Sequence, residues 1–559
     1  MAGAGAPLLV IGLDGATLDL VGPWAAAGRL PHLARLLGAG AWARLASTVP
    51  PATFPAWTSL FTGVNPGRHG VLDFTERVPG TWRMRLVTGR HRRVPALWNR
   101  MAAAGRRVAV LTVPATYPPE PVPGIMVSGW DSPLTTAIDG SFVHPRAFFA
   151  DIRARIGRLP FADFQEIATG PGWHARALAS LLDGIERRTC LAETVLARER
   201  WDACVVVFGE SDTVAHHFWR YHDAGSPRYE VSPFAGAIAR VYEALDAAVG
   251  RLVAAAPPDV AIAVVSDHGS GGAGDRVVHL NRRLAECDLL GFGAAGGMRV
   301  AGLARAAALR GVPHRLQAGL LRRAQGLAGR LEGMHRFGGI DWPRTLAYSE
   351  ELDYHPSVWV NLCGREPAGV VEPADYERVR ERVIAALREW VDDAGRPVVA
   401  RVHRREALYR GPASSRAPDL VVELASVAGY SPSCLRSAGP GPAVRQLTRA
   451  EHGAGKGAGM NGAHRPDGLL VLCGRGVAGV GDLGPVSIVD VLPTLLALAG
   501  LSVPDGLDGH PVLRALREAP RFAADPVPVA VPLPFELPAE AAQEVSARLA
   551  ALGYLEPGG

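Results

Sequence analysis

Six short apolar runs, each ending in a polar turn, are the feature that most restricts the fold of this chain. Runs such as PLLVIGLDG (7–15) and VAIAVVSDHG (260–269) are nearly continuous in small and branched apolar residues. Strands of this kind are typical of a mainly parallel sheet that is buried on both faces. The other four runs occupy residues 108–116, 203–212, 419–424 and 467–476.

Stretches with helical periodicity lie between these runs, at residues 32–40, 176–200 and 238–256. Strands that alternate with helices predict a large α/β fold, with helices on both faces of the sheet. In open sheets of this class, ligands bind beyond the carboxyl ends of the strands. Candidate functional residues are therefore expected directly after the apolar runs.

Length and composition fit a globular protein with a large core. The chain has 559 residues, of which 48% are hydrophobic and 20% charged. This length alone suggests roughly three or four domains. No apolar run reaches the roughly 18 residues of a membrane span, and the N-terminus lacks the basic start and cleavage site of a signal peptide. We therefore expect a cytoplasmic protein with no transmembrane span.

The cysteines and the charges argue against several functions. Six cysteines are scattered without a CxxC pair, which disfavours a disulfide framework and a thiolate zinc site. The net charge is +5, and only one of the 59 basic residues is a lysine. We interpret this arginine bias as genomic composition. No nucleic-acid polymer is expected as a partner, because that function needs clustered basic and aromatic residues.

Three segments differ in composition from the predicted core. Residues 292–340 are rich in Gly, Ala and Arg and predict a basic helical insertion. We favour a solvated insertion, and a lid over an anionic substrate or a membrane-surface contact are the alternatives. Residues 365–410 predict an appended helix and strand, and residues 519–535 are a proline-rich connection to a closing helix.

Metal-capable side chains follow several of the apolar runs. Asp14 follows the first run, Asp212 and His216 stand four residues apart in DTVAH, and Asp267 is followed by His268 in VSDHG. Side chains four residues apart share one face of a helix. Each of these residues also has an ordinary structural interpretation as a turn, a cap or a surface histidine.

His464 completes the set, in a polar loop before the last apolar run. Three aspartates and three histidines supply the mixed oxygen and nitrogen donors that suit a pair of divalent ions. With no cysteine nearby and imidazole well represented among the donors, zinc is the leading candidate and manganese is the second.

Thr53 stands in an unusually stiff sequence, VPPATFPAWTSLFTG (49–63), with Pro50 and Pro51 before it and Pro55 after it. Proline is common in the first turn of a helix, where its missing N–H is not needed. Thr53 could therefore be an N-cap or a nucleophile held in place by its turn. The residues alone leave both interpretations open.

The order and local sequence of these pieces resemble the alkaline phosphatase superfamily. The type I phosphodiesterase/nucleotide pyrophosphatase family, in its prokaryotic soluble branch, is the most similar group. The resemblance runs from residue 7 to about residue 515. Five blocks carry it: LLVIGLDG, PPATFPAWTSLFTGVNPGRHGV, ESDTVAHHFW, VVSDHGSG and GAHRPDGLLVLCG.

This resemblance implies one alkaline-phosphatase-like catalytic domain over residues 1–515, instead of several serial domains. Insertions are then expected at about 75–200 and 285–345, besides the appended unit at 365–410, and residues 516–559 form the tail. The resemblance implies one divalent ion bound by Asp14, Thr53, Asp267 and His268, and a second ion bound by Asp212, His216 and His464.

The same resemblance implies a phosphoester hydrolase in which Thr53 attacks phosphorus and forms a phosphothreonine intermediate. In the nucleotide pyrophosphatase branch an asparagine that follows Thr-Phe-Pro helps to hold the phosphoryl oxygens, and Ala56 stands there in this chain. Asn461 and Lys456, in the glycine-rich stretch 452–464, and His279 are candidate substrate-binding residues in its place.

A small phosphoester, such as a nucleotide or a lipid head group, is the expected substrate, and the oligomeric state is left open. A phosphodiesterase is our first hypothesis, and a phosphomonoesterase or phosphonate hydrolase on the same core is the second. A sulfatase is disfavoured because Thr53 is neither cysteine nor serine and no Arg follows it. A metal-stabilised binding protein without catalysis is the hypothesis from a different class.

Overall fold

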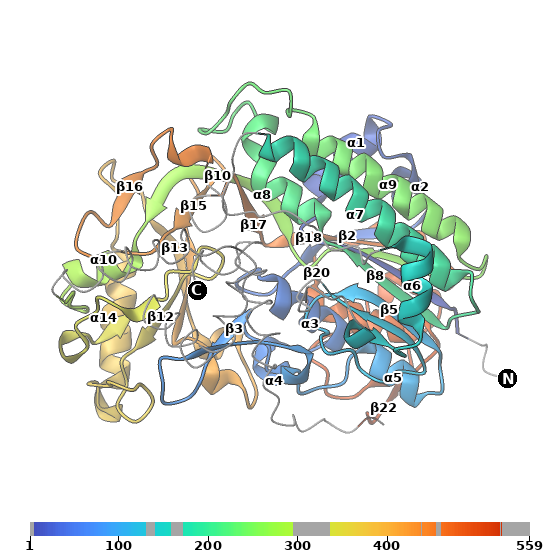
Figure 1. Ribbon diagram of the computed structural model, residues 1–559. Helices are drawn as coiled ribbons and strands as arrows, with labels where there is room; N and C mark the ends of the chain where they lie inside the picture. Colours follow the sequence, from blue (N-terminus) through green and yellow to red (C-terminus); the bar gives the residue numbers. More distant parts are fainter. Residues whose placement is uncertain are drawn as a thin grey trace.

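A large, mostly parallel sheet forms the centre of the molecule in the computed structural model (Figure 1), which describes residues 5–129, 140–157, 172–293, 336–437, 439–453, 460–525 and 527. Its strands follow the order β19-β2-β18-β9-β1-β8-β5-β6-β7, and β20 pairs with β2. The parallel strands are β9 (Ala261–Val265), β1 (Leu8–Leu13), β8 (Ala203–Phe208), β5 (Val108–Val113) and β6 (Gly124–Ser128).

The remaining strands extend this sheet at its two edges. On one side β18 (Asp467–Gly474) runs antiparallel to both β9 and β2 (Ala41–Ala46). The short strands β19 (Gly481–Asp482) and β20 (Val486–Ser487) pair with β2, and β7 (Val143–His144) pairs with β6 at the other side.

Helices cover both faces of the sheet, as the alternating pattern predicts. Every residue of β1, β5, β8 and β9 is buried. On one face α9 (Ala237–Ala255) packs against α7 (Trp173–Leu196), α8 (Glu210–His222) and α2 (Pro31–Ala39). Figure 1 shows α3 (Thr53–Thr62) and α5 (Leu97–Ala103) on the opposite face, where α16 (Val491–Leu498) packs against α3.

A second lobe, residues 278–293 and 336–447, has a hydrophobic core of its own. The long strand β10 (Gly269–Val278) leads into it from the carboxyl end of β9 (Figure 1). Three strands pair with β10: β15 (Ser431–Cys434), β16 (Val444–Gln446) and β17 (Gly462–Arg465). A separate antiparallel sheet contains β11 (Ala347–Tyr348), β12 (Ser357–Val360), β14 (Leu420–Leu424) and β13 (Val399–Arg404).

The helices α10 (Leu280–Glu286) and α14 (Tyr376–Arg388) complete the core of this lobe. The helix and strand that the sequence predicts at 365–410 correspond to α14 and β13. They do not form an appended unit by themselves, because they share their core with residues before 293 and after 420. The shorter elements of the chain are α1 (Leu18–Ala26), α4 (Pro66–His69), β3 (Thr75–Arg77), β4 (Met84–Leu86), α6 (Phe148–Ile156), α15 (Arg405–Leu408), β21 (Val503–Pro504) and β22 (Phe522–Ala523).

Residues 75–200 do not form the insertion that we expected. This region instead supplies β5, β6 and β7 of the central sheet and the helix α7 that covers it. Most of the expected basic insertion, residues 294–335, and the tail beyond residue 527 lie outside the described residues. Among the helices that the structure describes, none is both long enough and apolar enough to cross a membrane.

Candidate active site

Asp14, Asp267 and His268 lie together at the carboxyl ends of two neighbouring strands. Asp14 directly follows β1, while Asp267 and His268 follow β9, which pairs with β1 in parallel. The three residues, called the strand-end group below, each place one donor atom within 4.8 Å of the others. His268 Nε2 lies 3.3 Å from Asp267 Oδ2 and 3.6 Å from Asp14 Oδ1. All three are 0% exposed.

Asp212, His216 and His464 make a second cluster, called the helix group below. Asp212 and His216 stand one turn apart on α8, and His464 lies on β17. Asp212 Oδ1 lies 3.1 Å from His216 Nε2 and 3.5 Å from His464 Nε2. The two histidine Nε2 atoms are 3.1 Å apart. The spacing of DTVAH therefore produces the shared helix face that we expected.

The two groups adjoin and form one site. The imidazole rings of His268 and His464 are stacked, with their centroids 3.7 Å apart. This contact arises because β17 pairs with β10, the strand that begins immediately after His268, and His464 lies opposite Ser270 in that pairing. All six predicted aspartates and histidines are thus brought together from segments that span residues 14–464.

The hydrogen bonds of the three histidines suit metal ligands. Each Nδ1 donates to a backbone carbonyl: His216 to Gly462 at 3.1 Å, His268 to Gly269 at 3.0 Å, and His464 to Pro51 at 2.7 Å. Because a carbonyl can only accept, these contacts place the ring proton on Nδ1 and leave Nε2 for a metal ion. The close Nε2 pair of His216 and His464 is favourable only with a proton or a metal ion between its members.

The pKa values of Asp267 in the strand-end group and Asp212 in the helix group are shifted in opposite directions. Burial, together with the charge of Asp212, raises the pKa of Asp267 well above its ordinary value. Burial alone would also raise the pKa of Asp212, but His216 and His464 outweigh it and hold that pKa well below its ordinary value. Burial and the neighbouring His464 lower the pKa of His268, which favours the neutral imidazole that binds metals. A bound cation would compensate the buried carboxylates.

Thr53 is the first residue of α3, and its side chain faces the strand-end group. Ala52 is the N-cap of this helix, and no side chain caps it. The interpretation of Thr53 as the N-cap is therefore wrong. Its Oγ1 lies 3.4 Å from His268 Nε2, and the residue is 0% exposed. The structure thus places one hydroxyl group beside the metal-capable cluster.

The predicted substrate-binding residues that the structure describes lie at different distances from the site. Asn461 lies beside the helix group, where its backbone N–H donates to His216 O at 3.0 Å and its amide to His217 O at 3.4 Å. His279 follows the far end of β10 and donates from Nδ1 to Leu435 O at 2.7 Å, so the structure does not bring it to the site. Lys456 lies outside the described residues. Ala56 is 0% exposed inside the hydrophobic core, and its methyl group cannot supply the hydrogen bond of an asparagine at this position.

A parallel α/β sheet with two adjoining groups of oxygen and nitrogen donors at its carboxyl edge is the architecture of the alkaline phosphatase superfamily. The family model for type I phosphodiesterase/nucleotide pyrophosphatase matches residues 8–433. The chain belongs to this family and is a hydrolase that acts on phosphoester bonds. The family is metal-dependent, in agreement with the two donor groups.

Two solved structures are similar to this chain at low sequence identity, and the first of them shows the same fold. Human ectonucleotide pyrophosphatase/phosphodiesterase 5 superposes with a TM-score of 0.50 and 12% identity, over 92% of this chain and 100% of that chain. The murine protein of the same name, an inactive variant in complex with AMP, gives a TM-score of 0.46 and 12% identity, over 89% and 96% of the two chains. No curated protein sequence matches the chain.

Proposed function

We propose that this enzyme hydrolyses phosphodiester or pyrophosphate bonds of small molecules with Thr53 as its nucleophile and two divalent metal ions as cofactors. The strand-end group and Thr53 would hold one ion, and the helix group would hold the other. The observation that carries the proposal is the position of Thr53 Oγ1, 3.4 Å from His268 Nε2, the imidazole that stacks on His464 of the helix group. Zinc suits these donors best, and manganese is the alternative.

When bound, the ions supply the positive charge that favours a threonine alkoxide and a hydroxide at neutral pH. Thr53 Oγ1 forms a bond to phosphorus while the bond from phosphorus to the leaving oxygen breaks. The product of this step is a phosphothreonine ester and a free alcohol or phosphate. Water then attacks the same phosphorus from the opposite side and releases Thr53 with its proton restored.

The protein's contribution to this step is the fixed placement of the nucleophile. Thr53 begins α3, so the partial positive charge of the helix N-terminus favours the phosphoryl group at this point. Pro50 and Pro51 precede it, and Pro55 lies in the first turn, which limits the backbone conformations that Thr53 can adopt. Fixed placement matters because small displacements of a nucleophile lower the rate strongly.

Substrate class and location complete the proposal. A nucleotide or a lipid head group would be the substrate, in the cytoplasm. A phosphomonoester or phosphonate would be the substrate of the alternative enzyme on the same core.

One experiment tests the reaction and separates these substrates. Zinc-loaded wild type is assayed with bis-p-nitrophenyl phosphate, p-nitrophenyl phosphate and a phenylphosphonate ester. We expect the diester to be the best substrate, and Thr53→Ala to lower its turnover by about 10³-fold or more, because no nucleophile remains. Thr62→Ala, on the same helix but bonded to Thr58 O at 2.6 Å, is the matched control and should stay active.

The outcomes divide the hypotheses. Faster turnover of the monoester or of the phosphonate would favour the alternative enzyme. Bound zinc with no hydrolysis of any of the three compounds would favour the binding protein. Full activity of a folded Thr53→Ala variant would remove Thr53 from the mechanism.

A further inference from the structure

Trp57 binds the carboxylate of Asp14 through its indole N–H. The Nε1–Oδ2 distance is 2.7 Å, and both residues are 0% exposed. We propose that Trp57 is a positioning residue, which orients Asp14 for metal binding and fixes the nucleophile helix to the strand-end group. This inference rests on the proposed function, because it takes Asp14 as a metal ligand.

The spacing along α3 gives Trp57 this role. Trp57 follows Thr53 by four residues, so both side chains lie on the same face of the helix. Thr53 Oγ1 approaches His268 Nε2 at 3.4 Å, while Trp57 approaches Asp14. One helix face therefore contacts two different members of the strand-end group, and α3 cannot shift without disturbing both contacts.

The hydrogen bond also divides the two oxygens of the Asp14 carboxylate. Oδ2 accepts from Trp57, and Oδ1 is the oxygen that lies 3.6 Å from His268 Nε2. Hydrogen bonds of this kind to a ligating carboxylate fix its orientation, and their loss typically lowers metal affinity by about 10–100-fold.

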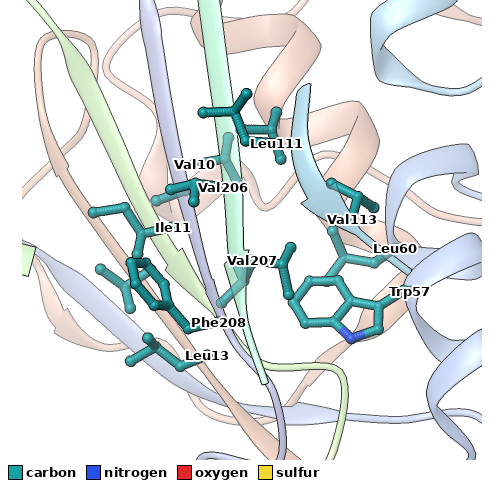
Figure 2. Close-up of a cluster of buried hydrophobic side chains, with 14 of the residues drawn as sticks. Val10, Ile11, Leu13, Trp57, Leu60, Leu111, Val113, Val206, Val207 and Phe208 are labelled. Carbon is teal, nitrogen blue, oxygen red and sulfur yellow. The ribbon is translucent and has the colours of Figure 1, made fainter. Parts of the chain in front are cut away.

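Tight packing holds the indole ring in this orientation. A Cβ atom at Gly12, on β1 two residues before Asp14, would lie 2.5 Å from the ring atom Cη2, so only glycine leaves room for the ring. Figure 2 shows the ring beside Leu60, Val113 and Val207, with its nitrogen on the side away from Leu60 and Val113. Packing fixes the ring, and the N–H points to the buried carboxylate of Asp14.

Trp57→Phe tests the inference, because it keeps an aromatic ring in the core and removes only the donor and part of the ring. Trp98→Phe is the matched control, since Trp98 is also buried and its indole N–H donates to a different carboxylate, Glu120 Oε1, at 3.1 Å. Metal-free proteins are titrated with Zn²⁺ against a chromophoric chelator. We expect both proteins to bind two ions, and we expect each of the two affinities to be the same in Trp98→Phe as in wild type.

In Trp57→Phe one of the two Zn²⁺ affinities should fall by about 10–100-fold and the other should not change. In an Asp212→Ala background, which removes a ligand of the helix group, the same substitution should weaken the remaining ion. If Trp57→Phe fails to fold, β-(3-benzothienyl)alanine at position 57 keeps the bicyclic ring, has sulfur in place of the N–H, and should give the same loss.

Unchanged affinities, or an equal loss at both ions, would overturn the inference and leave Trp57 as a packing residue. Wild type that binds no Zn²⁺ would instead contradict the proposed function itself, so the two failures can be told apart.

Discussion

The strand-end group and the helix group contain the same kinds of donor, but they are built in different ways. The strand-end group lies on the ends of β1 and β9 in the middle of the central sheet, and all its members are fully buried. The helix group depends on the docking of α8 against β17, which pairs with β10 and not with the central sheet. The strand-end group is therefore fixed by the core of the central sheet, and the helix group by the packing of α8 against β17.

The pKa shifts follow this difference. The raised pKa of Asp267 means that burial opposes its charge, whereas the lowered pKa of Asp212 means that nearby histidines stabilise its charge. Without metal, the strand-end group should therefore destabilise the fold, while the helix group should stabilise it. Metal binding should therefore stabilise the strand-end group more than the helix group, because the strand-end group has less positive charge beside its carboxylates.

The largest expected effect is the loss of one ion and of catalysis when either group loses one carboxylate. Asp267→Ala and Asp212→Ala should each bind one zinc ion fewer per chain than wild type. Both should hydrolyse bis-p-nitrophenyl phosphate about 10³-fold or more slowly, because the proposed reaction needs both ions. Metal analysis and steady-state kinetics check this prediction, and wild-type zinc content in either variant would contradict the ligand assignment.

A smaller effect, of opposite sign in the two groups, is expected on the stability of metal-free protein at pH 7. Asp267→Asn should raise the free energy of unfolding by about 1 kcal/mol, because the uncharged amide avoids the cost of burying a charged carboxylate. Asp212→Asn should lower it by a similar amount, because His216 and His464 lose their anionic partner. Denaturant unfolding in EDTA measures both, and shifts of the same sign would break the comparison.

The pH dependence of that stability has a sign for each group. The folded pKa of Asp212 lies below its ordinary 3.8, so its contribution is present above pH 3.8 and is lost as the pH falls further. The folded pKa of Asp267 lies above 3.8, so its contribution is present below pH 3.8 and is lost as the pH rises. Subtracting the pH profile of each Asn variant from that of wild type should show these opposite slopes.

The smallest effect is expected at Asn461, whose amide donates to His217 O at 3.4 Å beside the helix group. Asn461→Ala should lower the free energy of unfolding by about 0.5 kcal/mol, the low end for one hydrogen bond, because the contact is long. It should weaken only the zinc ion of the helix group, because the lost contact is to α8, the helix that carries Asp212 and His216. Equal weakening of both ions would show that the two groups do not respond independently.

Much of this architecture was predictable from local sequence. The apolar runs at 7–15 and 260–269 are long and continuous enough to identify β1 and β9, and the residues that follow them must lie at the carboxyl edge of the sheet. The four-residue spacing of Asp212 and His216 is likewise a local property of α8.

Features that depend on distant contacts were not predictable. Residues 75–200 contain only one strong apolar run, at 108–116, so β6 and β7 become strands only through pairing with β5 and with each other. The second lobe joins residues before 293 to residues after 336 through one core. The burial of Ala56 and the bond from Trp57 to Asp14 depend on how α3 rotates against the sheet. The four-residue spacing of Thr53 and Trp57 was the one sequence feature that indicated the bond from Trp57 to Asp14.

The stereochemical course at phosphorus tests the central claim most directly, that Thr53 forms a covalent intermediate. Zinc-loaded enzyme hydrolyses a phosphorothioate diester of known configuration in water enriched in heavy oxygen, and the chiral product is analysed. Two successive in-line displacements, first by Thr53 and then by water, invert the phosphorus twice, so we expect overall retention. Overall inversion would mean that water attacks the substrate directly, and it would contradict the nucleophilic role of Thr53.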